Sequence, residues 1–189
     1  CLPFLDALTS GYLICAPCDF GLVGRSDDNG THWDFSWGVD HVMENPEFVK
    51  EHLLSQVEGE PMTSLGAQQL KLTNFFTVTT PKGYSSLFTP VLNNKELMLA
   101  GIHFHSAVVD TDSFDLPVQL PFAFTNFTGQ SIMIKKGTPL VQVLPFKRES
   151  WKMEVKEVKM EKQHGKQLRL QSMLFERYRK LFHKKKTYT

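Results

Sequence analysis

The sequence predicts a mainly β fold with one short inserted helix and an amphipathic helix near its C-terminus. From residue 67 to residue 146, short runs rich in Phe, Val, Ile and Thr alternate with turn-forming Pro, Gly, Asn and Asp, a pattern typical of strands joined by tight turns. Aromatic residues make up 12% of the 189 residues, and Phe alone accounts for 15, which favours a packed core over disorder. Several short strands at this spacing, among them 73–80 and the longer run 97–110, indicate a sandwich or barrel.

The first third of the chain contains a hairpin signal. Residues 11–24 are expected to form one or two strands, interrupted at Pro17. Residues 28–30, Asp-Asn-Gly, tolerate the positive φ angles that a tight hairpin turn requires. The strand after this turn, 33–39, places two Trp and one Phe on one face by alternation.

Two further segments are expected to be helical. Residues 46–57 place apolar side chains near helical spacing, with Asn45 as the N-cap and a proline in the first turn. Residues 167–183 carry an apolar stripe at the spacing of an amphipathic helix, and three lysines follow it. Between the β region, which ends at residue 146, and this helix, residues 151–160 alternate apolar and charged side chains, which indicates an edge strand.

The chain therefore divides into a β domain with one inserted helix, 1–160, and a basic C-terminal helix and tail, 161–189. Residues 1–146 carry 7 Lys/Arg and 15 Asp/Glu, a net charge of −8, whereas residues 147–189 carry 14 and 5, a net charge of +9. Such asymmetry can mark contact with nucleic acid or a membrane surface. We favour two other interpretations, in which the basic helix has a solvated charged face or the tail of one subunit docks on the acidic body of another.

Cysteine usage and hydropathy bear on the compartment. The three cysteines, Cys1, Cys15 and Cys18, are too few for a disulfide scaffold, so a reducing cytoplasm is expected. No apolar run reaches the ~18–20 residues that a membrane span needs. A chain that begins at Cys1 indicates processing, a lipobox cysteine or an incomplete reading frame.

Three motifs resemble, in order and approximate spacing, those of the dUTP pyrophosphatase and dCTP deaminase superfamily. They are PKGY at 81–84, VVDTD at 108–112 and IKKGTPLVQ at 134–142. The resemblance implies a β-clip fold, a homo-oligomer that is usually a trimer, and a nucleotide ligand. If the chain acts on nucleotides, Mg²⁺ is the implied cofactor.

The same resemblance implies roles for individual residues. Asp110 would orient the attacking water, and Gln142 matches the end of the third motif. Tyr84, Asp112 and Phe114 would contact the ligand.

The chain departs from the superfamily at both of its phosphate-binding elements. Residues 90–94 read PVLNN where the superfamily has Arg-Ser-Gly, and a basic helix replaces the Gly-rich C-terminal arm. The aromatic residue expected after the second motif is shifted by one, to Phe114. Phosphoryl chemistry depends mainly on positioning and charge neutralisation. We therefore expect a non-catalytic binding or structural module, with a divergent nucleotide-acting enzyme using Asp110 as the alternative.

The whole chain also resembles an uncharacterised family of marine phage and bacterial proteins. The resemblance rests on the segments PCDF, WDFSWGVDH, TPKGY, VVDTD, KGTPLVQVLPFKRESW and YRKLFHKKK. It implies a phage-associated protein in the host cytoplasm, and it implies no activity.

A third hypothesis is a metal-binding β-barrel. His103 and His105 are separated by one residue on an expected strand, so alternation places both imidazoles on one face. Asp110 and Asp112 could complete a set of nitrogen and oxygen ligands. The alternative is that both histidines lie on a solvent-facing sheet surface.

The spacing of Cys15 and Cys18 matches a CxxC pair. A redox pair requires the first cysteine at a helix N-terminus, and a zinc site requires two further ligands. Here the pair lies between expected strands, so we interpret it as two unrelated thiols.

Overall fold

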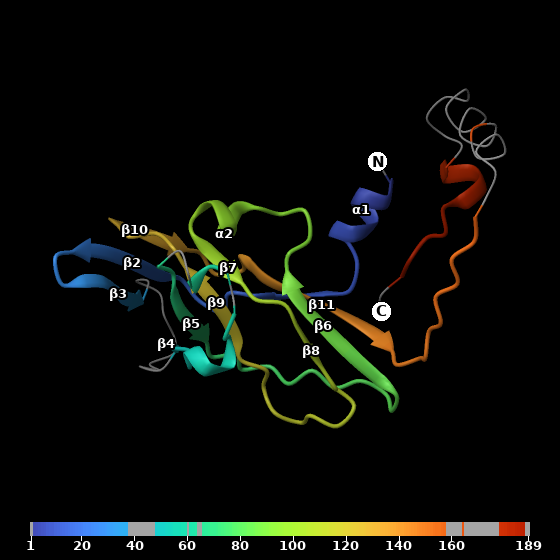
Figure 1. The fold of residues 1–189 in the computed structure, drawn as a ribbon, viewed down its shortest axis with the longest axis horizontal. Coiled ribbons are helices and arrows are strands. Elements are labelled where there is room, and N and C mark those ends of the chain that lie inside the picture. Colours follow the sequence, from blue (N-terminus) through green and yellow to red (C-terminus); the bar gives the residue numbers. More distant parts are fainter. Residues whose placement is uncertain are drawn as a thin grey trace.

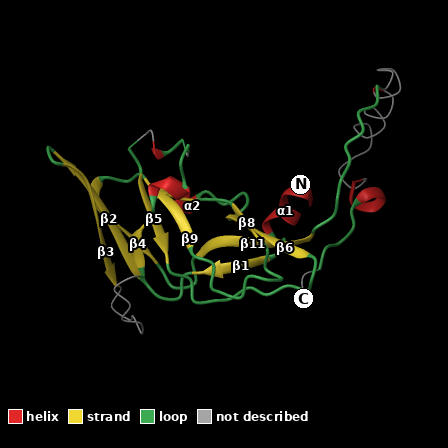
Figure 2. Ribbon diagram, turned by 60° about the horizontal axis from the view of Figure 1, so that its bottom comes forward, coloured by secondary structure: helices red, strands yellow, loops and turns green. Residues whose placement is uncertain are grey.

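The computed structural model describes residues 2–37, 48–59, 61–63, 66–157, 164 and 178–187. Their strands form three antiparallel sheets (Figure 1). We call them sheet A (β1, β11, β6 and β8), sheet B (β10, β2 and β3) and sheet C (β4, β5, β9 and β7). Figure 2 shows sheet B at one end of the strand-containing body, sheet A at the other, and sheet C between them. The prediction of a mainly β fold is confirmed.

Sheet A carries most of the residues on which the functional argument depends. Its strand order is β1-β11-β6-β8. Strand β11, which is late in the sequence, therefore lies between β1, which is early, and β6, which is near the middle of the sequence. The bounds are β1 (Tyr12–Cys15), β11 (Pro139–Lys147), β6 (Tyr84–Pro90) and β8 (Ala107–Val109).

Sheet B contains the hairpin that the sequence predicts. Its order is β10-β2-β3, with β10 (Thr128–Ile134), β2 (Phe20–Asp27) and β3 (Gly30–Trp37). The hairpin closes with Asp27 opposite Gly30, and the Asn29 amide donates to Asp27 Oδ1 at 2.8 Å. Asp, Asn and Gly therefore supply the turn chemistry that their sequence order indicates.

Sheet C joins the other two through the core. Its order is β4-β5-β9-β7, with β4 (Val49–Glu51), β5 (Gln68–Leu72), β9 (Leu120–Phe124) and β7 (Ile102–Phe104). One core cluster contains buried side chains from all three sheets. Each buried Phe or Leu contributes about 1.5–3 kcal/mol relative to an exposed one. Fully buried members are Phe20, Leu22, Leu70, Phe122, Phe124, Val141 and Val143.

The helices are short. They are α1 (Leu2–Leu8), α2 (Glu96–Leu99), a 3-10 turn (Leu54–Gln56) and a π-helical turn (Tyr178–Phe182). No helix in the described ranges has the length and apolar character needed to span a bilayer. The chain beyond β11 runs away from the sheets, and its last described residues return to α1 (Figure 1). There Asp6 accepts hydrogen bonds from His183 Nε2 at 3.2 Å and from Lys186 Nζ.

The helix predicted for residues 46–57 is wrong where the structure describes it. Val49–Glu51 is strand β4, which pairs with β5, and a 3-10 turn follows. Phe48 is buried, with its ring stacked on Phe75 at 6.0 Å. Pairing and ring packing therefore override the local helical spacing. The predicted N-cap, Asn45, and the first-turn proline lie outside the described residues.

Three β predictions also need correction. Residues 73–80 and 151–157 carry neither strand nor helix. The apolar run 97–110, expected as one strand, is divided into α2, β7 and β8, and these two strands belong to different sheets. Gly101 makes this division possible because its φ of +89° ends α2 in a tight turn against Asn126. Most of the predicted helix 167–183 lies outside the described residues.

We predict that Gly24→Ala destabilises the fold. A Cβ at this position would lie 2.3 Å from the carbonyl oxygen of Asn126 and 2.7 Å from the Phe124 ring. Because a backbone atom and a core ring would have to move, the free energy of unfolding should fall by about 1–3 kcal/mol. Urea denaturation measures this change. Ser26→Ala, on the exposed end of the same strand, is the control, and equal midpoints for both variants would contradict the packing argument.

Candidate functional site

The ends of three strands of sheet A bring acidic and basic side chains together. Lys147 pairs with Tyr84, and Ser86 pairs with Val109. The residues just beyond β11 and β8 therefore meet beside the start of β6. This places Arg148 against Asp110 and Asp112, and we call these three residues the Arg148 cluster.

Arg148 binds both carboxylates of this cluster. Its Nη1 and Nη2 donate to Asp112 Oδ1 at 2.9 Å and Oδ2 at 2.5 Å, a bidentate pair. Its Nη1 also lies 3.1 Å from Asp110 Oδ1. The Gly83 amide donates to Asp112 Oδ2 at 2.8 Å, and Ser85 Oγ donates to Asp110 Oδ1 at 2.6 Å. The guanidinium is thus shared between two carboxylates that are also hydrogen-bonded to β6 and its turn.

The electrostatics follow from this geometry. The Arg148 guanidinium, together with the Gly83 amide, lowers the pKa of Asp112 to about 2 from an ordinary 3.8. Asp112 in turn raises the pKa of Arg148. The Asp112 side chain is 5% exposed, whereas that of Asp110 is 64% exposed. Asp110 therefore retains access to solvent, although one of its oxygens is already engaged.

Most of the ligand-contacting residues named from the sequence lie at this cluster. The backbone oxygen of Tyr84 accepts from Arg148 Nη1 at 2.9 Å. The amide of Phe114 donates to the backbone oxygen of Asp110 at 2.9 Å, and its ring is 41% exposed. The structure therefore brings Tyr84, Asp110, Asp112 and Phe114 together around an arginine that sequence reasoning did not single out.

Gln142 lies elsewhere and has a structural role. It is fully buried on β11, six residues before Arg148, or about 20 Å along an extended strand. Its Oε1 accepts from the Leu92 amide at 2.9 Å. Its Nε2 donates to the backbone oxygens of Ala7 at 2.9 Å and Ser10 at 2.5 Å. Gln142 thus fastens the end of α1 to sheet A, and it does not share a site with Asp110.

The two histidines are each held by a neighbouring polar side chain. His103 Nε2 lies 3.1 Å from Thr125 Oγ1, and His105 Nε2 lies 2.8 Å from Gln69 Oε1. His103 is on β7 of sheet C, whereas Asp110 follows β8 of sheet A. Within the described ranges, no group of three or more His, Cys, Asp and Glu side chains is arranged to hold a metal ion.

The CxxC thiols are free. Cys15 is partly buried at the end of β1, and Cys18 is buried. Burial raises the pKa of the Cys18 thiol, and the nearby Asp19 carboxylate raises it further. Neither influence favours the thiolate that redox exchange or metal binding requires.

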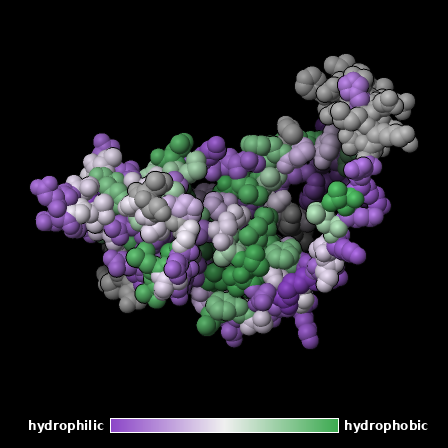
Figure 3. Space-filling model, viewed as in Figure 1, coloured by the Kyte–Doolittle hydropathy of each residue, from purple (hydrophilic) through white to green (hydrophobic). Residues whose placement is uncertain are grey.

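One face of sheet A exposes a row of apolar side chains. Leu144 pairs with Leu87, and Leu87 pairs with Val108, so the three residues form a row across β11, β6 and β8. Val108 is 61% exposed, and Phe146, two residues further along β11 and therefore on the same face, is 42% exposed. We call Leu87, Val108, Leu144 and Phe146 the open face. Apolar atoms gather over β6 and β8 in the space-filling view (Figure 3).

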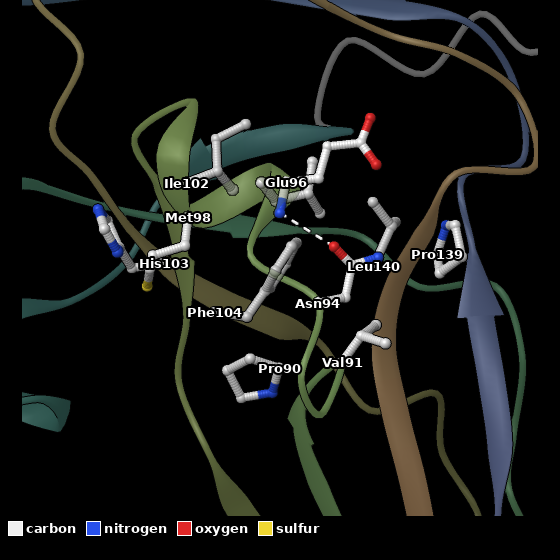
Figure 4. Close-up of a pocket in the computed structure, with 11 residues that line it drawn as sticks. Pro90, Val91, Asn94, Glu96, Met98, Ile102, His103, Phe104, Pro139 and Leu140 are labelled. Atoms are coloured by element: carbon white, nitrogen blue, oxygen red, sulfur yellow. Dashed lines mark hydrogen bonds between the residues drawn. The ribbon is translucent and has the colours of Figure 1, made fainter. Parts of the chain in front are cut away.

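An apolar cavity of about 120 Å³ lies beneath α2. The buried side chains of Ile102, Phe104 and Leu140 form part of its wall. Pro90 at the end of β6 and Val91 just after it line the cavity, and Met98 lies at its edge beside His103 (Figure 4). Asn94 Oδ1 accepts from the Glu96 amide at 3.0 Å and so fixes the turn into α2.

Comparison with known proteins adds no family to this geometry. No protein-family model, no curated protein and no solved structure matches the chain.

Sequence reasoning missed Arg148 and the cavity for different reasons. Arg148 is one of 14 Lys and Arg residues in the basic segment 147–189, and nothing in the sequence distinguishes it from the others. Only the strand register places it against Asp112. The cavity depends on α2, which sits inside an apolar run that reads as a strand. The signal that could have revealed α2 is Gly101, because a glycine inside such a run often marks a turn.

We predict a specific acid sensitivity for Asp112. Its folded pKa of about 2 lies below the ordinary 3.8, so its contribution to stability is complete above about pH 4 and is lost as the pH falls through about 2. Asp112→Asn removes this contribution. The free energy of unfolding of the unmodified protein should therefore fall more steeply with pH in this window than that of the variant.

Denaturant titrations at a series of acidic pH values measure both slopes. Asp115→Asn, in the same loop, is the matched control and should follow the unmodified protein. Parallel curves for the unmodified protein and Asp112→Asn would contradict the assigned role of the Arg148 pair.

We also predict that Gln142→Met destabilises the fold and loosens α1. The change preserves volume but leaves the Leu92 amide and two backbone oxygens without their side-chain partner. The expected loss is about 2–4 kcal/mol, with faster amide hydrogen exchange in residues 2–10. Gln130→Met, on an exposed position of β10, is the control. Unchanged exchange in α1 would show that Gln142 does not fasten it.

Proposed function

We propose that this chain is a non-catalytic, β-clip-like module that associates with further copies of itself through the open face of sheet A. The observation that carries the proposal is the row Leu144–Leu87–Val108, which crosses three strands and leaves Val108 61% exposed. The order of the three superfamily-like motifs supports the β-clip assignment.

The energetics favour covering this face. Apolar surface removed from water contributes about 25 cal/mol per Å², and a contiguous exposed apolar patch is typical of an interaction site. The arm (residues 149–157) adds a second apolar surface, because it leaves β11 directly beyond the Arg148 cluster. Its alternating residues Trp151, Met153 and Val155 are 86%, 85% and 82% exposed.

The charge distribution favours a second copy as the partner. Residues 147–189, which include the arm, are strongly basic at +9, whereas residues 1–146 carry −8. Each copy therefore offers one acidic body with an apolar face and one basic segment with an apolar arm. Reciprocal exchange between copies pairs both surfaces, and closed symmetric assemblies are the common result. The trimer implied by the family resemblance is one such assembly.

The Arg148 cluster supports a binding role more than a catalytic one. A general base has to accept a proton from the reacting group, and Asp110 already accepts from Ser85 and Arg148 through Oδ1, which leaves Oδ2 for that role. The second proposed catalytic residue, Gln142, is buried against α1. Turnover of a deoxynucleotide by the unmodified protein, lost in Asp110→Asn, would contradict this part of the proposal.

We predict that Val108→Glu disrupts self-association. A carboxylate in the middle of the open face would have to be buried without a partner, so the oligomer should shift to monomer, with at least about tenfold weaker association. Sedimentation velocity across a concentration series measures the shift. Met133→Glu, on the exposed part of β10 in sheet B, is the matched control and should leave assembly unchanged.

The arm is tested by replacing Trp151, Met153 and Val155 together with Ser. This variant should retain the fold, because these side chains are exposed in the single chain, and it should associate more weakly than the unmodified protein. A protein that stays monomeric at every concentration, before any substitution, would overturn the proposal.

A further inference from the structure

The cavity beneath α2 lies apart from the surfaces used for the proposed function. It opens between the segment after β6, α2, β7 and the start of β11. Residues of the open face and of the Arg148 cluster do not line it. Binding of a ligand in this cavity would therefore be independent of self-association through the open face.

The wall of the cavity is mostly apolar. Ile102 is 2% exposed, Leu140 is 3% exposed and Phe104 is 6% exposed, so these side chains are fixed in the core. The Phe104 ring packs on the ring of Phe122, with centroids 5.4 Å apart. The cavity floor is thus rigid and preformed, as small-molecule sites usually are.

The roof of the cavity is less tightly held. α2 has four residues, and none of them is buried. Met98 is 43% exposed and Leu99 is 81% exposed. Methionine adapts its shape to different partners, so a short helix with Met98 at the rim can accommodate a guest without moving the sheets.

The rim indicates the charge of the guest. Glu96 is the charged side chain of the lining, and the lining residues include no Lys or Arg that could pair with an anion. His103 contributes a ring whose Nε2 is engaged with Thr125 Oγ1. An apolar wall beside a carboxylate disfavours anions and offers a neutral ring a dry surface.

We propose that this cavity binds a small, neutral, largely apolar ring compound. The volume of about 120 Å³ sets the size, because apolar cavities of about 150 Å³ lined by Leu, Ile and Phe bind benzene. Phe104 and Leu140 supply the contact surface, and α2 closes over the guest.

Methyl NMR with benzene as the probe tests this site. Millimolar benzene should shift the methyl signals of Ile102, Leu140 and Met98 in a saturable way. Val91→Phe fills the cavity from its wall and should abolish the shifts. Val23→Phe makes the same change on a partly buried position of β2, outside the cavity, and should leave binding unchanged.

A second comparison tests the charge argument with a substitution at the rim residue Glu96, which leaves the apolar part of the wall intact. Benzoate has the same ring with a carboxylate and should bind roughly tenfold more weakly than benzene. Glu96→Gln should reduce that difference without altering benzene binding. The proposal is overturned if benzene shifts no methyl signal of the cavity, if Val91→Phe still folds and binds it, or if benzoate binds as well as benzene.

Discussion

The pairing of β11 with β6 is the constraint on which the rest of the structure depends. The two strands pair in unbroken register over seven residues, from Val141 opposite Pro90 to Lys147 opposite Tyr84. Because alternation is strict along this pair, one face receives core residues such as Val141 and Phe88, and the other receives Gln142, Leu144 and Leu87. A shift of one residue would exchange the two faces completely.

The open face of sheet A has a different neighbour at each end. Gln142 anchors the end of α1 at one end through two hydrogen bonds, and Arg148 joins the turn after β8 at the other. Between them lies the apolar row that the chain itself leaves partly exposed. Gln142 and Arg148 thus hold the two ends of the apolar row in place, and neither side chain lies within the row. Such an arrangement suits an interface, because the apolar row stays free to contact a partner. The arm begins directly after the second anchor, Arg148.

Part of the strand pattern could be predicted from the sequence, and tertiary contacts decided the rest. The hairpin around Gly30 follows from local turn chemistry, and the structure confirms it. The segment near Phe48 looks helical by spacing alone, yet its ring packs into a core that forms from distant strands.

The candidate site shows the same division between local and long-range information. Tyr84, Asp110, Asp112 and Phe114 could be named from short motifs, and they do meet in space. The role of Arg148 depends on strand register, which no local pattern encodes. Gln142 belongs to a motif that resembles a catalytic one, and its hydrogen bonds show a structural use of the same residue type.

Concentration-dependent hydrogen–deuterium exchange of the unmodified protein tests the central claim most directly. If the open face of one copy is covered by another, amides of β6, β8 and the arm should become more protected as the protein concentration rises, whereas those of β3 in sheet B should not change. Equal exchange of β6, β8 and the arm at all concentrations would contradict the account, because it would leave the apolar row and the arm in water in the protein's working state.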